Sequence, residues 1–169
     1  MLTCDFLVIG GGVIGLSIAR ELKARHKHTR IILIEKESSC GAHASGRNSG
    51  VLHAGFYYSP DSLKAKFTKL GNERLTGYCE RNNIPLNRCG KLVVAKDAGD
   101  LPSLDELVKR GRANGIEIQE LTEAEAKRIE PRVKTFHRAL FSPRTATVNP
   151  QLVVDAMQRD AIREGVEIR

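Results

Sequence analysis

Apolar runs separated by turn residues predict a β-α-β unit at the start of the chain. The continuous apolar run Thr3–Ile9 predicts a strand buried inside a parallel sheet. Gly10–Gly15 forms a turn, and Leu16–Arg25 continues as a helix. The run Arg30–Glu37 predicts a second buried strand. Because strand, helix and strand follow one another directly, we expect two parallel strands joined by a right-handed crossover.

The middle of the chain is predicted to alternate between helices and short strands. Helices are expected over Ser62–Asn82, over Leu104–Asn114 with Gly115 as C-cap, and from the capping box Thr122–Glu125 to Pro131. The first of these helices has a broad apolar face, made by Leu63, Phe67, Leu70, Leu75 and Tyr78. Strands are expected over Gly90–Ala95, Ile116–Leu121 and Ala139–Pro143.

The last residues predict a helix and a strand that return to the first sheet. Asn149 is a helix N-cap followed by a proline at the first helical position, so a helix is expected from there to about Glu164. Val166 then begins a strand, which needs neighbours in a sheet, but the chain stops at Arg169. We therefore expect the chain to be truncated.

Composition and charge leave several kinds of partner open. With 28% charged and 41% hydrophobic residues, the chain has the composition of a folded protein. The net charge of +7 suits an anionic cofactor, an acidic substrate, a membrane surface or a nucleic acid. The few aromatic residues argue against a stacking surface for single strands, so we expect no nucleic-acid partner. The four cysteines show no paired spacing, so we expect reduced thiols, no metal site and a cytoplasmic protein.

A glycine-rich turn and an acidic residue predict a dinucleotide site. Gly10, Gly12 and Gly15 form the pattern G-x-G-x-x-G between the first strand and its helix. These glycines allow a tight turn and close approach of a pyrophosphate, which the helix N-terminus attracts. Glu35 lies about 20 residues after Gly15, where an acid accepts hydrogen bonds from a ribose hydroxyl. An acid there disfavours NADP, because it would repel the 2′-phosphate.

The residues that follow this unit favour FAD over NAD. An NAD-type domain continues with further β-α units, whereas Cys40–Gly50 is rich in glycine and small polar residues. Small side chains suit a segment that lies along an extended cofactor, because the backbone must come close to it. The stretch Ala44–Tyr58, "ASGRNSGVLHAGFYY", is therefore predicted to follow the cofactor from the pyrophosphate to the flavin.

Several segments are similar to the L-2-hydroxyglutarate oxidase/dehydrogenase family, within the larger group of FAD-dependent oxidoreductases built like D-amino-acid and glycine oxidases. They are "VIGGGVIGLSIARELK", "IEKE", "RNSGVLHAGFYYSPDSLKAK" and "CGKLVVA". The resemblance implies an α/β fold: a Rossmann-like FAD-binding domain with a parallel sheet, interleaved with the start of an α+β substrate domain with an antiparallel sheet. It divides the chain into a first FAD-binding part (1–84), part of the substrate domain (85–148) and a returning helix and strand (149–169). Members of the family are longer, so a C-terminal part is expected to be missing.

The resemblance also implies an activity and a set of cofactor contacts. Members oxidise L-2-hydroxyglutarate to 2-oxoglutarate with non-covalently bound FAD and pass the electrons to a quinone chain or to oxygen. Gly50–His53 would run beside the isoalloxazine ring. The implied cofactor contacts are Gly10, Gly12, Val13, Ile14, Gly15, Glu35, Lys36, Ala44, Ser45, Arg47, Asn48, Ser49, Gly50 and Val51.

His53 is the candidate catalytic base, because oxidation of a 2-hydroxy acid needs a group that accepts the hydroxyl proton near neutral pH. The alternative is a histidine that only hydrogen-bonds the flavin or the backbone. Tyr57 and Tyr58 either line a pocket for a small acid or pack in the core. Arg47 balances phosphate charge or clamps a substrate carboxylate, and we favour the cofactor.

Other interpretations of the sequence stay open. Lys64, Lys66 and Lys69 either attract a dicarboxylate or form a solvated helix face, which we favour. The protein as a whole is alternatively a related amino-acid, amine or glycerol-3-phosphate oxidoreductase, or a truncated and inactive FAD-binding module. The expected partners are a small 2-hydroxy dicarboxylic acid and an electron acceptor, and any membrane contact is expected to be peripheral.

Overall fold

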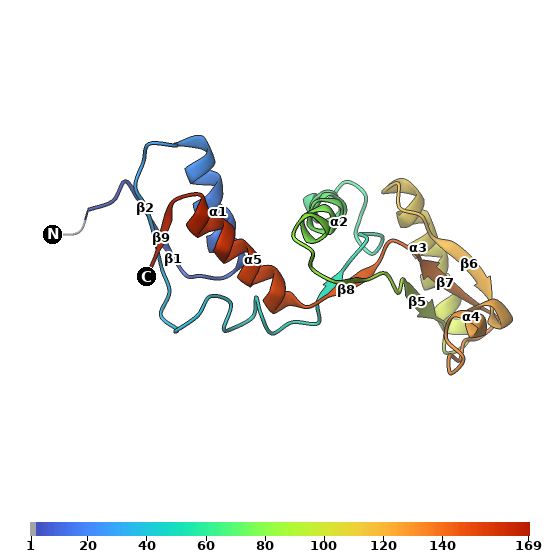
Figure 1. The fold of residues 1–169 in the computed structure, drawn as a ribbon. Coiled ribbons are helices and arrows are strands. Elements are labelled where there is room, and N and C mark those ends of the chain that lie inside the picture. The colour runs from blue at the N-terminus through green and yellow to red at the C-terminus, as the bar shows by residue number, and fades with distance from the viewer. Residues whose placement is uncertain (1–2) are drawn as a thin grey trace. The chain divides into compact units, whose positions relative to one another are not determined.

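A computed structural model describes residues 3–169 and divides them into two units (Figure 1). Unit 1 comprises residues 3–50 together with Asn149–Arg169, and unit 2 comprises Val51–Val148. Each unit is a group of residues that pack mainly against one another. The predicted division into 1–84, 85–148 and 149–169 concerned the binding of cofactor and substrate, which packing does not reveal, and it stays a prediction.

Unit 1 contains a parallel sheet of three strands and two helices (Figure 1). β2 (Ile31–Ile34) lies in the centre, with β1 (Phe6–Ile9) on one side and β9 (Val166–Ile168) on the other. α1 (Val13–Arg25) connects β1 to β2, and α5 (Pro150–Arg163) leads into β9 and packs beside α1. The predicted β-α-β unit and the return of the last strand to the first sheet are confirmed.

The core of unit 1 lies where the two helices pack on the sheet. Leu16 and Ala19 of α1 are fully buried against Leu33 of β2 and Val154 of α5. Burial of such apolar surface is the main favourable term in folding. The prediction of a buried strand is therefore confirmed for β2, because Leu33 lies in this core.

The prediction of a buried strand over Thr3–Ile9 is wrong for β1. The strand begins at Phe6, and Leu7 and Ile9 are 54% and 79% exposed. Within residues 3–169, β1 has a neighbouring strand on one side only, and its alternate side chains point away from the core that buries Val8. A continuous apolar run predicts the strand but not which of its faces is covered.

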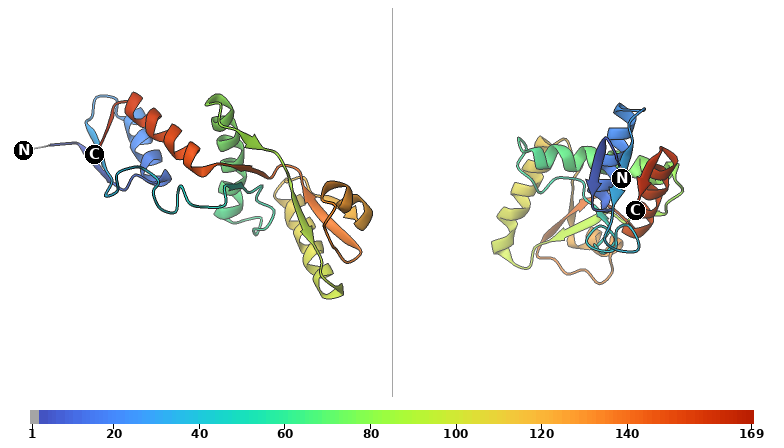
Figure 2. Two further views of the ribbon diagram at one scale, coloured as in Figure 1. Left: turned by 60° about the horizontal axis from the view of Figure 1, so that its bottom comes forward. Right: turned by 90° about the vertical axis from the view of Figure 1, so that its left-hand side faces the viewer.

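Unit 2 contains two antiparallel sheets of three strands each. Figure 2 shows its helices and longer strands from two further sides. In the first sheet, β8 (Ala146–Val148) lies between β3 (Val51–Leu52) and β4 (Leu86–Asn87). In the second, β7 (Arg138–Ser142) lies between β5 (Lys91–Val94) and β6 (Gln119–Thr122). The expected mixture of a parallel sheet with antiparallel sheets is confirmed. The strands of the first sheet were not predicted, because two or three residues give no recognisable pattern.

Helices cover both sheets of unit 2. α2 (Leu63–Arg81) packs against β3 and β4. The second core, formed by α3 (Leu101–Ala113) on β5 and β7, buries Leu104, Val108 and Leu140. A short 3-10 helix, η1 (Ala98–Asp100), precedes α3. α4 (Glu123–Ile129) begins at the predicted capping box, in which Thr122 and Glu125 exchange hydrogen bonds.

The apolar face predicted for α2 is wrong in part. Leu63 and Phe67 are 68% and 61% exposed, whereas Ala65, Asn72 and Cys79 are buried. The buried residues are seven positions apart, or two helical turns, and two of them are small, so α2 lies close to the first sheet along this line. No helix within residues 3–169 combines the length and the apolar character needed to cross a bilayer.

Asn72 connects α2 to the first sheet of unit 2, and its removal is expected to destabilise the fold. Its buried Nδ2 donates to the carbonyl oxygens of Leu52 at 3.0 Å and Arg144 at 3.3 Å. Asn72→Ala leaves both carbonyls without this donor, so we expect the free energy of unfolding, measured in urea, to fall by about 1–3 kcal/mol. Asn82→Ala removes one hydrogen bond at the end of the same helix and serves as the control. An equal loss in both variants would contradict the role of Asn72.

Candidate functional site

The turn between β1 and α1 depends on glycines, for reasons that differ from one position to the next. Gly10 has a φ of +104°, which favours glycine, and a Cβ at Gly15 would lie 2.0 Å from the carbonyl oxygen of Gly10. A Cβ at Gly12 would lie 3.0 Å from Ser45 Oγ. The predicted tight turn is therefore formed, and its backbone lies directly against the loop that follows β2.

Three hydrogen bonds attach this turn to the loop after β2. The amide of Gly11 donates to Glu35 Oε2 at 2.6 Å, and its carbonyl accepts from the amide of Gly41 at 3.1 Å. The amide of Val13, the first residue of α1, donates to Ser45 Oγ at 3.1 Å. The end of β1, the start of α1 and the loop after β2 are thus fixed relative to one another.

Glu35 supports the turn through its carboxylate. Besides Gly11, it accepts a hydrogen bond from the amide of Glu37 through Oε1 at 3.1 Å. The amides of Glu37 and Gly11 stabilise the ionised form and lower the pKa of Glu35 below its ordinary value. The carboxylate is therefore charged at neutral pH and keeps capacity to accept further hydrogen bonds. Its predicted contact with a ribose hydroxyl stays a prediction.

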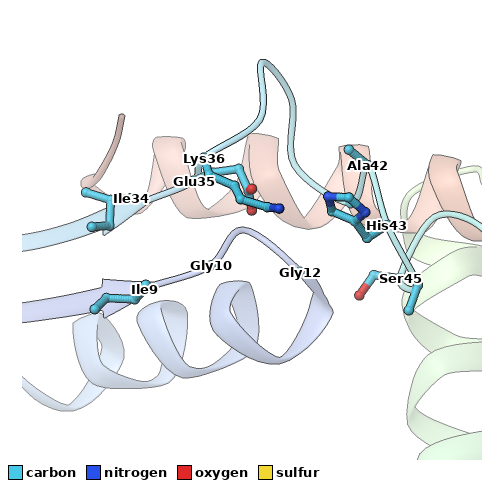
Figure 3. A pocket seen from close by; sticks show the side chains of 11 residues that line it. Ile9, Gly10, Gly12, Ile34, Glu35, Lys36, Ala42, His43 and Ser45 are labelled. Atoms are coloured by element: carbon cyan, nitrogen blue, oxygen red, sulfur yellow. The ribbon is translucent and has the colours of Figure 1, made fainter.

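A cavity of about 500 Å³ opens at this edge of the sheet (Figure 3). Its lining includes six of the predicted cofactor contacts: Gly10, Gly12, Glu35, Lys36, Ala44 and Ser45. It also includes residues that were not predicted as contacts: Ile9, Ile34, Gly41, Ala42 and His43. Ile9 and Ile34 end β1 and β2, and the carboxyl ends of parallel strands are a common place for ligands, so their position was a usable signal.

The remaining predicted contacts do not line this cavity. Val13, Ile14 and Gly15 lie in the first turn of α1. Asn48 shapes the loop, because its Nδ2 donates to the carbonyls of Ala44 and Ser45, each at 3.0 Å, and its Oδ1 accepts from the amide of Gly50 at 2.9 Å. Arg47 and Ser49 are exposed in the same loop, and Val51 lies in β3 of unit 2. Their contacts with a cofactor stay predictions.

The cavity has the chemistry of a phosphate and nucleotide site. α1 begins at Val13. Its N-cap residue is Gly12, which has no side chain to cap the helix, and its first turn contains no acidic residue. Its N-terminal end is therefore positive and faces the cavity through Gly12. Ile9 and Ile34, exposed at the strand ends, add an apolar surface beside it. An anionic ligand with a flat apolar part fits this combination.

His53 follows β3 in unit 2 and is exposed. The protein atoms around the ring still remove part of its hydration, and this desolvation, followed by the positive charge of Lys91, lowers the pKa of His53 below its ordinary value. The imidazole is therefore neutral at neutral pH and able to accept a proton.

The segment after His53 is held by its backbone carbonyls. Arg110 Nη1 donates to the carbonyl of Tyr57 at 2.9 Å. Asn114 Nδ2 donates to the carbonyls of Gly55 at 3.2 Å and Tyr58 at 3.0 Å. Phe56 is the buried aromatic residue of this segment, whereas both tyrosine rings are half-buried and each lies under a lysine. The tyrosines are therefore not simple core residues.

Comparison with known proteins matches the chain to one family along almost its whole length. The family described as "FAD dependent oxidoreductase" matches residues 5–169. L-2-hydroxyglutarate dehydrogenase of Escherichia coli K12 is 40% identical over 164 residues, which cover 97% of this chain and 39% of that protein. The mitochondrial L-2-hydroxyglutarate dehydrogenase of Nematostella vectensis is 39% identical over 165 residues, which cover 97% of this chain and 36% of that protein.

Solved structures of flavoenzymes share the fold. The FAD-bound L-α-glycerophosphate oxidase of Mycoplasma pneumoniae, reduced with dithionite, has a TM-score of 0.88 and 30% identity and covers 100% of this chain and 45% of its own. Glycine oxidase of Geobacillus kaustophilus has a TM-score of 0.85 and 25% identity, with coverage of 98% and 46%. The chain thus spans less than half the length of these proteins and of the curated relatives named above.

Substitution of Gly15 is expected to damage the turn. The Cβ in Gly15→Ala meets the Gly10 carbonyl and forces the turn away from α1, so we expect the free energy of unfolding in urea to fall by about 1–3 kcal/mol and dinucleotide affinity to fall with it. Gly71→Ala is the matched control, because a Cβ there meets nothing within 4 Å and should stabilise α2 by about 0.5–1 kcal/mol. Wild-type stability in Gly15→Ala would show that the turn adapts.

Proposed function

The chain belongs to the family of FAD-dependent oxidoreductases, and from this premise we propose that it forms part of an enzyme that oxidises L-2-hydroxyglutarate to 2-oxoglutarate. The observation that carries the proposal is the 40% identity to L-2-hydroxyglutarate dehydrogenase of E. coli K12 over 97% of this chain. The chain spans only 39% of the length of that relative. Oxidation of the substrate by this chain alone is therefore a further proposal.

The residues of unit 1 fit FAD. Gly10, Gly12 and the first turn of α1 would hold the pyrophosphate, since they offer close backbone approach and a positive helix end. Glu35 would accept a hydrogen bond from the ribose, and its lowered pKa keeps it ionised for this task. When bound, FAD supplies the acceptor for a hydride.

His53 is proposed as the base. Oxidation of a secondary alcohol removes one proton from the hydroxyl and one hydride from the carbon that carries it. The neutral imidazole accepts the hydroxyl proton, and burial and Lys91 favour this neutral form. Tyr57, held by its carbonyl to Arg110, would present its hydroxyl to the same small acid.

A second candidate is the oxidation of glycerol 3-phosphate or an amino acid. The likeness to L-α-glycerophosphate oxidase, with 30% identity, and to glycine oxidase, with 25%, supports it. Both identities are lower than the 40% to L-2-hydroxyglutarate dehydrogenase, so we favour the hydroxyglutarate. A quinone chain or oxygen as electron acceptor rests on the resemblance alone. A cytoplasmic location, predicted from the unpaired cysteines, and a peripheral membrane contact also remain parts of the proposal.

The substrate is tested by anaerobic addition of candidate compounds to the FAD-loaded protein. We expect L-2-hydroxyglutarate to bleach the flavin absorbance and glycine, sarcosine and glycerol 3-phosphate to leave it unchanged. Bleaching by one of the other three compounds alone would identify a different oxidoreductase. Protein that holds FAD but is reduced by none of the four would be an inactive FAD-binding module.

Substitution of the base is expected to slow the reaction without loss of substrate affinity. In His53→Gln, we expect the rate of flavin reduction at saturating L-2-hydroxyglutarate to fall about 100-fold or more, because no group accepts the hydroxyl proton. In the wild type, the rate should fall as the pH drops through the lowered pKa of His53, since protonation then removes the base. A rate in His53→Gln equal to that of the wild type would leave His53 with only a hydrogen-bonding role.

A further inference from the structure

Two segments far apart in the sequence meet at Ser142–Ala146, which connects β7 to β8. Leu52 pairs with Ala146 at the end of this segment, and Lys91 pairs with Ser142 at its beginning. The amide of Gly90 donates to the carbonyl oxygen of Thr145, in the same segment, at 3.0 Å. His53 directly follows the pairing at one end, so the connection brings His53 and Lys91 into the same neighbourhood although they are far apart along the chain.

The packing of β5 directs Lys91 toward the segment after His53. Lys91 and Val93 lie on the same face of the strand, because they are two residues apart. Val93 packs against a cluster that contains Phe56 and Tyr57. Lys91 Nζ itself lies 4.6 Å from the centroid of the Tyr57 ring. The ammonium group therefore sits over Tyr57, and its charge acts on the imidazole of His53.

Lys91 is half-buried as a residue, and within residues 3–169 it forms no ion pair with an acidic side chain. Other lysines of the chain do have such partners: Lys127 Nζ lies 2.7 Å from Glu123 Oε1 and Lys36 Nζ 3.4 Å from Glu37 Oε1. The ring of Tyr57 attracts the ammonium group of Lys91 but does not neutralise its charge. An anion from outside the chain would complete the site, since it would pair with this charge.

We propose that Lys91 binds a carboxylate of the substrate while His53 accepts the proton of the substrate hydroxyl. This inference rests on the proposed function, whose substrate is a 2-hydroxy dicarboxylate. Lysine is a compact point charge on a flexible stem, and the ring of Tyr57 restricts where that charge lies. The positive charge of Lys91 then favours a substrate that carries a carboxylate next to the reacting hydroxyl. The neutral imidazole of His53 does not provide this selectivity.

The test measures binding of glutarate, which carries the two carboxylates but no hydroxyl to be oxidised. In FAD-loaded protein, we expect Lys91→Met to raise the dissociation constant of glutarate about 10- to 100-fold by calorimetry, the loss that one charged hydrogen bond predicts. Lys91→Arg keeps the charge and should restore most of the affinity. Lys64→Met is the matched control, because Lys64 Nζ lies 4.5 Å from the centroid of the Tyr58 ring on the exposed side of α2. It should bind glutarate like the wild type.

A second readout follows the NMR titration of the His53 ring. Glutarate should raise the pKa of His53 in the wild type, because it neutralises Lys91, and should not do so in Lys91→Met. Unchanged glutarate affinity in Lys91→Met, or an equal loss in Lys64→Met, would overturn the proposal. Loss of glutarate binding in Lys91→Met alone supports it even where L-2-hydroxyglutarate fails to reduce the flavin, so failure of the proposed function is recognised separately.

Discussion

The close contact between the turn after β1 and the loop after β2 is the constraint on which unit 1 depends. The amide of Gly11 donates to Glu35, its carbonyl accepts from Gly41, and a Cβ at Gly11 would lie 2.6 Å from Cys40 Sγ. The backbone of the turn thus lies directly against the loop after β2, so the ends of two strands and the start of α1 together form one wall of the cavity. This contact places the positive end of α1 at the cavity without a capping side chain at Gly12.

The sequence predicted this part of the fold well because the glycine motif acts through backbone geometry. Gly10 and Gly15 are required by a positive φ and by a carbonyl at 2.0 Å, which are local properties. The exposure of β1 and of Leu63 on α2 could not be predicted in the same way. It depends on which elements cover each face, and an apolar pattern does not contain that information. Strands such as β3 exist only through pairing with β8, far along the chain.

In the candidate site too, the sequence predicts residues that belong to a local motif better than residues brought together by the fold. Glu35 was found from its spacing to the glycines, and His53 from the chemistry that the reaction requires. The role proposed for Lys91 could not be predicted, because in the sequence it is an ordinary lysine at the start of a strand. Only the pairing of β5 with β7 and the ring of Tyr57 distinguish it from exposed lysines such as Lys64.

The two units use different kinds of chemistry, and this has a consequence for specificity. The binding groups of unit 1 are mainly backbone amides and a helix end, which recognise phosphate whatever the substrate is. The groups proposed for unit 2 are the side chains of His53, Tyr57 and Lys91, which would bind the substrate through proton transfer and charge. If these side chains act as proposed, proteins of this fold that differ in substrate should differ in the side chains around His53, because these can be exchanged without disturbing the glycine turn.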